Sequence, residues 1–351
     1  MSVLTRNSAP ALLPVSAPKQ AHPVPRWQGR ALTTAALAVT LCAGTAFTGL
    51  TPAHAASTVG ASIPAGPNPQ GVAISPDGQK AYVTDVGNGK ITVIKVSNNT
   101  KTGTITLARN AKPGAVAFSP DGTKAYVTDQ TSKLVKVIQV STNTMVGSIA
   151  VQSASYGVAF SSSSDKAYVT NYDDASVSVI KVSTNTVERR IPVGNNPFWV
   201  RFSKDGHKAG VTNEADGTVS GIKVATDTVV VTIPVGGSPD GGAFSPNGVK
   251  GYVTNSANDT VTVIDVASRQ VIGTPIAVGM NPIGLAVSPD STKVYVTNYD
   301  DDTVSVIPVS TDTVIATLPV GSYPYAVDFN PSGTKAYVAN SGSNTVTVIN
   351  S

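Results

Sequence analysis

One five-residue phrase recurs seven times along the chain, and no other feature restricts the fold so strongly. Its fullest form is Ala-Tyr-Val-Thr-Asn, and successive copies begin 42 to 44 residues apart. A fixed period of about 40–45 residues, filled with short alternating strands, is typical of β-propeller blades. Seven copies therefore predict one closed ring of seven blades in this 351-residue chain. The copies begin at Ala81, Ala125, Ala167, Ala209, Gly251, Val294 and Ala336.

A single repeat, residues 279–320, shows how each blade is built. It contains four short runs rich in β-branched and apolar residues, at Ile283–Val287, Val294–Thr297, Thr303–Ile307 and Val314–Leu318. Polar, turn-forming residues separate the runs, and no run has a helical period. The repeat therefore predicts an all-β fold in which four antiparallel strands form each blade.

The last repeat stops before its fourth strand, and the missing strand is found at the other end of the ring. Thr58–Gly66 has the pattern of a fourth strand such as Thr228–Gly236. We therefore expect residues 57–65 to complete the seventh blade as its outer strand. This closure would pair strand edges that would otherwise be open to aggregation.

The first 55 residues do not share the repeat. Arg26 and Arg30 precede an apolar run from Ala31 to Leu50, and Ala53–Ala55 gives a small-x-small cleavage pattern. These features predict a signal peptide over 1–55, with an uncleaved membrane anchor as the alternative. Cleavage would leave residues 56–351 as one propeller domain without a membrane span. The expected location is extracellular, either secreted or at the cell surface.

Composition excludes several kinds of site once the leader is set aside. The leader holds four basic and no acidic residues, so residues 56–351 carry 21 of each and no net charge. Nothing therefore favours nucleic-acid binding, which needs a clustered basic surface. Cys42 is the only cysteine, so the mature chain would be free of disulfides, and His207 is its only histidine. The sequence predicts no metal site and no cofactor, and a monomer is plausible.

Three recurring motifs point to a known family. They are Tyr-Val-Thr-Asn, the Ser-Pro-Asp-Gly hairpin at 75–78 and 119–122, and Ile-Pro-Val-Gly at the end of the fourth strand. Together they resemble the YVTN-type β-propeller repeat family over residues 57–351. The resemblance implies a seven-bladed propeller among secreted or surface-exposed bacterial proteins. It implies little about function, because a fold does not dictate activity.

Functional residues are expected where the copies differ. The residue after the loop proline, or its equivalent, varies from blade to blade and includes three aromatic residues. These positions should surround the mouth of the central channel and form a shallow funnel, the usual shape of a ligand site. The alternative is that the rings only plug the channel. The candidate binding residues are Tyr156, Phe198, Trp199, Arg201, Asp240, Tyr323, Tyr325 and Asp328.

Blade four departs most from the other copies. Trp199 and Arg201 replace a usual Gly and Ala, and Gly210 replaces the tyrosine of the recurring phrase. A charge at a small, buried position is costly unless it is paired. We expect Arg201 to pair with Asp240 of the next blade, since Asp328 should be too far around the ring. The alternative is a structural ion pair or solvation by channel water.

Charged loops distinguish the two faces of the expected ring. The loops at 172–174, 214–216 and 299–302 are acidic and should share the face of the channel mouth. One lysine per blade should lie on the opposite face, together with His207. The acidic loops offer oxygen ligands of the kind that Ca²⁺ takes, although no Asp-x-Asp-x-Asp-Gly loop occurs.

Two classes of function remain open. The first is a binding or scaffold protein that recognises a protein, a glycan or a small molecule through the funnel. The second is a secreted enzyme of the lyase, lactonase or cyclase type, with Asp, Arg and Tyr in an aromatic pocket. The chain shows no nucleophile with a base, no histidine cluster and no metal motif, so the sequence favours binding over catalysis.

Overall fold

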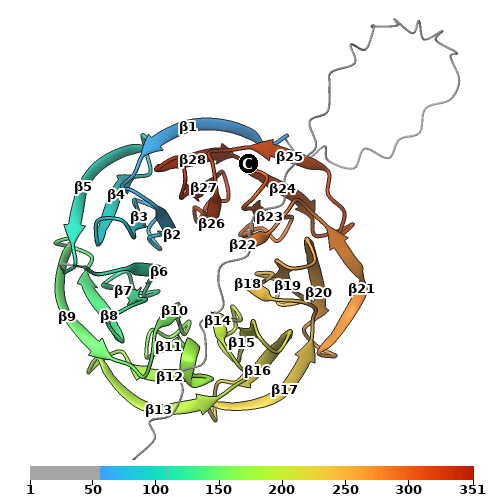
Figure 1. Ribbon diagram of the computed structural model, residues 1–351, viewed down its shortest axis with the longest axis horizontal. Coiled ribbons are helices and arrows are strands. Elements are labelled where there is room, and N and C mark those ends of the chain that lie inside the picture. The colour runs from blue at the N-terminus through green and yellow to red at the C-terminus, as the bar shows by residue number, and fades with distance from the viewer. Residues whose placement is uncertain (1–55, 109) are drawn as a thin grey trace, which may run out of the picture. The chain divides into compact units, whose positions relative to one another are not determined.

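Seven four-stranded antiparallel sheets are arranged around a central axis, like blades of a propeller (Figure 1). The computed structural model describes residues 56–108 and 110–351. The predicted signal peptide at 1–55 and its cleavage pattern lie outside the described residues. The all-β, seven-bladed architecture expected from the repeat is confirmed, and the described residues include one short helix, η1 (Tyr172–Asp174).

Strands follow one another from the centre of the ring to its rim. Blade 1 holds β2 (Pro69–Ile74), β3 (Lys80–Asp85), β4 (Lys90–Lys95) and β5 (Thr100–Thr106); blade 2 holds β6 (Pro113–Phe118), β7 (Lys124–Asp129), β8 (Leu134–Gln139) and β9 (Thr144–Ala150). Blade 3 holds β10 (Ser155–Phe160), β11 (Lys166–Asn171), β12 (Ser176–Lys181) and β13 (Thr186–Pro192); blade 4 holds β14 (Pro197–Phe202), β15 (Lys208–Asn213), β16 (Thr218–Lys223) and β17 (Thr228–Pro234). Blade 5 holds β18 (Pro239–Phe244), β19 (Lys250–Asn255), β20 (Thr260–Asp265) and β21 (Gln270–Ala277); blade 6 holds β22 (Pro282–Val287), β23 (Lys293–Asn298), β24 (Thr303–Pro308) and β25 (Ala316–Pro319).

Blade 7 joins the two ends of the ring, as predicted. It holds β26 (Pro324–Phe329), β27 (Lys335–Asn340) and β28 (Thr345–Asn350), and its outer strand is β1 (Thr58–Pro64). β1 pairs antiparallel with β28, and Ile63 lies opposite Val346. The side chain of Ile63 is 3% exposed, so this closure buries apolar surface as well as backbone hydrogen-bonding groups.

Each residue of the recurring phrase has its own packing or hydrogen-bonding role. Its tyrosine is fully buried between blades, as Tyr82 shows. Its threonine hydroxyl bonds the inner strand of the next blade, as in Thr84 Oγ1 to the Gly114 carbonyl at 2.7 Å. Its asparagine bonds within the blade, as in Asn171 Nδ2 to the Ser178 hydroxyl at 3.0 Å. Each copy therefore holds its own blade together and attaches it to the next one.

A second contact between blades, which we call the clasp, lies on the other side of the tyrosine ring. The Tyr126 hydroxyl donates to Asn185 Oδ1 at 2.7 Å, and Lys124 Nζ donates to the same oxygen at 3.2 Å. Asn185 has a φ of 55°, a left-handed conformation that Asn and Asp adopt more readily than most residues. The same tyrosine contact joins Tyr82 to Asn143, Tyr168 to Asp227, Tyr252 to Asp312, Tyr337 to Asn99 and Tyr295 to Ser57.

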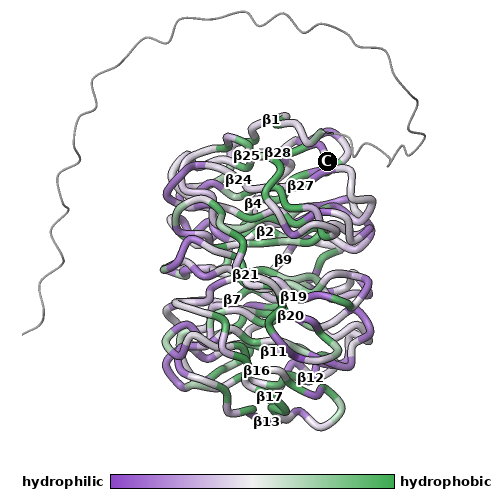
Figure 2. Tube along the Cα trace, turned by 90° about the vertical axis from the view of Figure 1, so that its right-hand side faces the viewer, coloured by the Kyte–Doolittle hydropathy of each residue, from purple (hydrophilic) through white to green (hydrophobic). Residues whose placement is uncertain are grey.

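Apolar residues gather along the strands and polar residues along the loops. Seen edge-on, the ring shows hydrophobic colouring through its middle and hydrophilic colouring on the loops of its two faces (Figure 2). The core is divided among the contacts between blades, where Val, Ile, Ala and Tyr side chains pack. Among the described residues, the structure has no helix with the length and apolar character needed to cross a membrane.

Candidate functional site

The channel mouth is built from one equivalent position in each inner strand. Tyr156, Phe198, Asp240 and Tyr325 are each the second residue of β10, β14, β18 and β26. Their carbonyl oxygens accept hydrogen bonds from threonine hydroxyls of the preceding blade, as in Thr212 to Asp240 at 2.7 Å. The framework of the recurring phrase therefore fixes the backbone at these positions, while the side chains are free to differ.

Three aromatic rings pack together at blades 3 and 4. Tyr156 stacks on Phe198 with ring centres 5.0 Å apart, and Tyr172 lies 4.9 Å from Tyr156. Tyr172 also meets Phe198 edge-on at 6.5 Å. Because Tyr172 belongs to η1, between β11 and β12, this contact confirms that these loops share a face with the starts of the inner strands.

A second aromatic group lies at blades 6 and 7. Tyr299 stacks on Tyr323 with ring centres 5.0 Å apart and meets Tyr325 edge-on at 6.3 Å. Tyr323 is 47% exposed, whereas Tyr325 is half-buried. The rings therefore pack in two groups, and each group includes at least one ring that is exposed or partly exposed to solvent.

Two carboxyl groups give the mouth its electrostatic character. The Tyr172 hydroxyl donates to Glu214 Oε2 at 2.8 Å. Burial raises the pKa of Asp240 to about 7, and the negative charge of Glu214 adds to the effect. Burial likewise raises the pKa of Tyr325, and Asp240 and Glu214 contribute to that shift. These carboxyl groups thus influence the pKa values of side chains around the same channel mouth.

Three of the eight predicted residues do not belong to this cluster. Arg201 lies over the indole ring of Trp199, 4.7 Å from its centre. Both Asp328 oxygens accept backbone hydrogen bonds, from Ile74 at 2.9 Å and from Phe329 at 3.0 Å. The predicted funnel is therefore not one cluster: the aromatic and acidic mouth is separate from the pair of Trp199 and Arg201, and Asp328 is held by backbone N–H groups.

The expected pairing of Arg201 with Asp240 is wrong. Burial lowers the pKa of Arg201, and the charge that opposes this shift is Asp328, not Asp240. The inner strands β14 and β26 lie across the central channel from each other (Figure 1), so Asp328 is far around the ring from Arg201, as expected. The ion pairs of the described residues do not include one between Arg201 and Asp328.

Some mouth residues were absent from the predicted set. Tyr172, Glu214 and Tyr299 come from loops between the second and third strands, whose acidic character was noted without assigning them to the site. The signal that could have found them is the shared face, since an aromatic residue of these loops can reach the inner-strand aromatic of its own blade or of the next, as Tyr172 and Tyr299 do. No group of three or more His, Cys, Asp or Glu side chains in residues 56–108 and 110–351 is placed to hold a metal ion.

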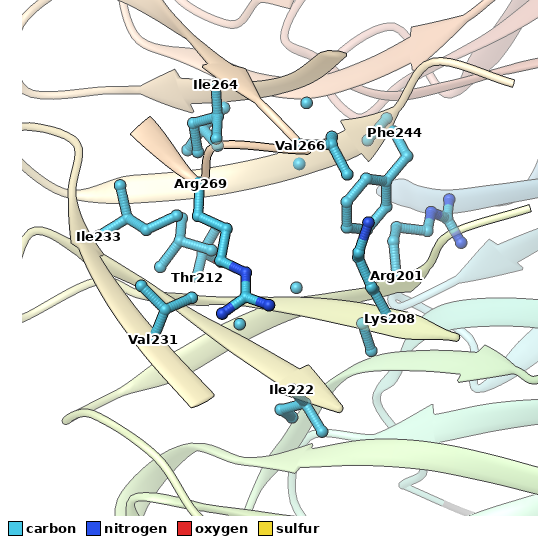
Figure 3. A pocket seen from close by; sticks show the side chains of 18 of the residues that line it. Arg201, Lys208, Thr212, Ile222, Val231, Ile233, Phe244, Ile264, Val266 and Arg269 are labelled. Atoms are coloured by element: carbon cyan, nitrogen blue, oxygen red, sulfur yellow. The ribbon is translucent and has the colours of Figure 1, made fainter. Parts of the chain in front are cut away.

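A cavity of about 650 Å³ lies away from the mouth, between blades 4 and 5 (Figure 3). Trp199 and Arg201 line it, together with Gly210 and with Phe244 from the next blade. Sequence comparison marked blade 4 as unusual through three of these residues, but it did not predict a cavity there. His207, expected on the face opposite the mouth, also lines it.

Comparison with known proteins supports the fold. A family profile described as "Lactonase, 7-bladed beta-propeller" matches residues 38–159. The matched part of the ring is β1 of blade 7, blades 1 and 2, and most of β10, so it includes Tyr156 but none of the other mouth residues. No curated protein matches the chain. A solved structure of Kuenenia stuttgartiensis hydrazine synthase is similar, with a TM-score of 0.75 and 22% sequence identity. That likeness covers 81% of this chain and 96% of the other, and at this identity it shows the shared fold alone.

Proposed function

We propose that this chain is an exported binding protein that takes a small ligand with an ammonium or amine group at the mouth of its central channel. The observation that carries the proposal is the Tyr172 hydroxyl bonded to Glu214, beside the stacked rings of Tyr156 and Phe198. Aromatic faces attract organic cations, and a neighbouring carboxylate strengthens the attraction. The mouth offers both groups together.

Charge distribution supports a cationic ligand over an anionic one. Burial raises the pKa of Tyr156, and the charged groups that add to the shift are Asp173 and Glu214. The charged side chains that act on Tyr325 are likewise Asp240 and Glu214, with no lysine or arginine of the described residues among them. A concave surface lined by one sign of charge raises the local concentration of the opposite ion.

Export is supported by the leader-like sequence at 1–55 and by the absence of cysteine from 56–351. The motif resemblance to the YVTN-type family supports the same context. In this proposal the seven copies of the recurring phrase form the scaffold, and the aromatic and acidic residues at the mouth provide recognition.

Calorimetric titration with choline and benzyltrimethylammonium tests the proposed function. We expect both cations to bind the wild-type protein, and Glu214→Gln and Tyr156→Leu each to weaken binding by roughly 5-fold or more, as removal of one cation–π partner or one charge implies. Glu188→Gln is the matched control, because Glu188 is an exposed carboxylate on β13, remote from the mouth. Equal binding by wild type, Glu214→Gln and Tyr156→Leu would reject the proposal.

A second candidate function is hydrolysis of a lactone, favoured by Asp240. A buried carboxyl whose pKa is about 7 suits general acid–base work near neutral pH. The lactonase profile that matches residues 38–159 supports a test of this chemistry. A pH-stat assay with a panel of simple lactones should show turnover that Asp240→Asn removes; no turnover by the wild-type protein would exclude the reaction for that panel.

A further inference from the structure

The interface between blades 4 and 5 lacks the side chains that fill every other one. Gly210 on β15 lies directly opposite Gly221 on β16. In each other blade the same pair is a tyrosine facing a valine. These pairs are Tyr82 with Val93, Tyr126 with Val137, Tyr168 with Val179, Tyr252 with Val263, Tyr295 with Val306 and Tyr337 with Val348.

Blade 5 makes matching changes on its side of the interface. Gly242 stands on β18 where the other inner strands carry valine or leucine. Arg269 stands where five of the other blades place the Asn or Asp of the clasp, and it keeps the same left-handed backbone, with a φ of 61°. Lys208, the clasp lysine of blade 4, makes no side-chain hydrogen bond or ion pair with a described residue. The clasp is therefore missing here, through changes in both partner blades.

These changes leave the cavity between blades 4 and 5 with an apolar body. Its walls include Val219, Ile222, Val231, Ile233, Phe244 and Ile264. At about 650 Å³, it is within the range of roughly 300–1,000 Å³ that small-molecule sites occupy. An empty apolar hole lowers stability in proportion to its volume, so a cavity this large is expected to be filled.

The lining also carries several positive charges and no carboxylate. Arg201, Lys208 and Arg269, labelled in Figure 3, belong to the lining together with Lys223, and no Asp or Glu does. Two acids that lie close in sequence to lining residues serve other partners. Asp205 accepts from the His207 backbone at 3.0 Å, and Asp265 accepts from the Ser268 hydroxyl at 2.6 Å.

Two polar groups at the channel end of the cavity have no hydrogen-bond partner among the described residues. Arg201 is half-buried and makes no hydrogen bond with a described residue, and its distant counter-charge, Asp328, already accepts two backbone hydrogen bonds. Trp199 Nε1 is buried without a hydrogen-bond partner. Buried donors and charges are costly when unpaired, and a carboxylate would satisfy both groups with charge-assisted hydrogen bonds.

We propose that the cavity between blades 4 and 5 binds a small organic carboxylate with an aliphatic or aromatic body. Its carboxylate lies against Arg201 and Trp199 Nε1, and its body fills the space left by Gly210, Gly221 and Gly242. Lys208 and Arg269 attract the anion from the clasp side. This site differs from the channel mouth in place and in the charge it selects.

Titration with a matched set of ten-carbon probes tests the ligand class. Decanoate, decanamide and 1-decanol share an aliphatic body, and decanoate alone of the three carries a negative charge. We expect decanoate to bind at least about 10-fold more tightly than either of the others, the ratio that one charge-assisted hydrogen bond implies. Equal affinity for the three probes, or none for decanoate, would overturn the proposal.

Variants test the location of the site. Gly210→Tyr restores the residue of the other six blades and should abolish decanoate binding, because its ring would occupy the cavity. A Cβ at this position meets Phe244 at 3.5 Å, an ordinary contact, so the backbone accepts a side chain. Gly210→Leu is the smaller filler if the tyrosine variant fails to fold. Unchanged decanoate affinity in a folded filler variant would contradict the assignment.

Arg201→Met tests the position of the carboxylate, with Arg190→Met as the control on exposed strand β13. We expect Arg201→Met to weaken decanoate binding by roughly 10-fold or more while leaving that of 1-decanol unchanged. Arg190→Met should change neither affinity. A loss shared equally by decanoate and 1-decanol would show that Arg201 acts by packing alone and would reject its assigned role. Choline binding at the mouth should survive Gly210→Tyr, so the two proposals fail independently.

Discussion

The guanidinium of Arg201 lies over the indole ring of Trp199, 4.7 Å from the ring centre. Trp199 stands where the other inner strands carry Gly or Ala, and Arg201 where they carry Ala, except for Asp328 in blade 7. Elsewhere a Cβ at the Trp199 position meets the next inner strand, as at Gly157, where it would come within 2.8 Å of the Phe198 carbonyl. At this position blade 4 thus lacks the close contact with the next blade that a small residue allows. It has instead a guanidinium that lies over an indole ring beside a cavity.

Copying the blade 4 substitution into blade 5 should destabilise the ring. Tyr252 is fully buried, and its hydroxyl donates to Asp312 at 2.9 Å. We expect Tyr252→Gly to lower the free energy of unfolding by about 3–5 kcal/mol, since a large core side chain is lost without compensation. Tyr252→Phe, which keeps the ring and loses one hydrogen bond, should cost about 1 kcal/mol. Urea denaturation of both variants measures the difference; equal losses would contradict the role given to the ring.

Deleting residues 56–66 should open the ring at blade 7. The deletion removes β1, exposes the edge of β28 and removes Ser57, the clasp partner of Tyr295. We expect the melting temperature to fall by about 5 °C or more, because β28 loses its strand partner and the core loses the buried side chain of Ile63. Differential scanning calorimetry checks this, with deletion of the terminal Ser351 as the control. A melting temperature equal to wild type would show that closure contributes nothing.

Blade 2 has Asp129 and Lys136 where blades 3 to 7 have Asn with Ser or Thr. Their side chains are 1% and 5% exposed and lie 3.4 Å apart. Asp129→Asn alone should cost about 3 kcal/mol, because it leaves a buried ammonium without its counter-charge. Adding Lys136→Ser, which restores the arrangement of blade 3, should recover most of the loss. A double-mutant cycle in urea measures the coupling energy, and simple additivity of the two changes would contradict the pairing.

Asp240 should make stability fall as pH rises. Its folded-state pKa is about 7, raised from 3.8, so the folded protein holds a proton that the unfolded chain releases between these values. The free energy of unfolding should therefore decline from about pH 4 to about pH 7, by at most about 1.4 kcal/mol per pH unit, and level off above. Asp240→Asn should remove this decline and be more stable than wild type at pH 8. An identical pH profile for both proteins would show that Asp240 titrates normally.

The period of the recurring phrase was enough to predict the blade number, the strand order and the closing strand at 57–65. It succeeded because each copy of Tyr-Val-Thr-Asn performs the same local and next-blade contacts, as Thr84 and Asn171 do. The candidate residues at the channel mouth were predicted less completely than the fold. Tyr156 and Phe198 come together as expected, but Tyr172 and Glu214 join them from a different loop, which alignment of the inner strands alone did not reveal.

The repeat by itself determined the architecture, because periodic contacts between neighbours follow from periodic sequence. Only the tertiary structure decided that Arg201 lies over the ring of Trp199 rather than against Asp240, since the surroundings of a side chain in the channel depend on how seven blades close. It also decided that Gly210, Gly221 and Gly242 share one space. Each glycine is a single replacement of a larger residue found in the other blades. A cavity forms only because folding brings the three glycines to the same interface.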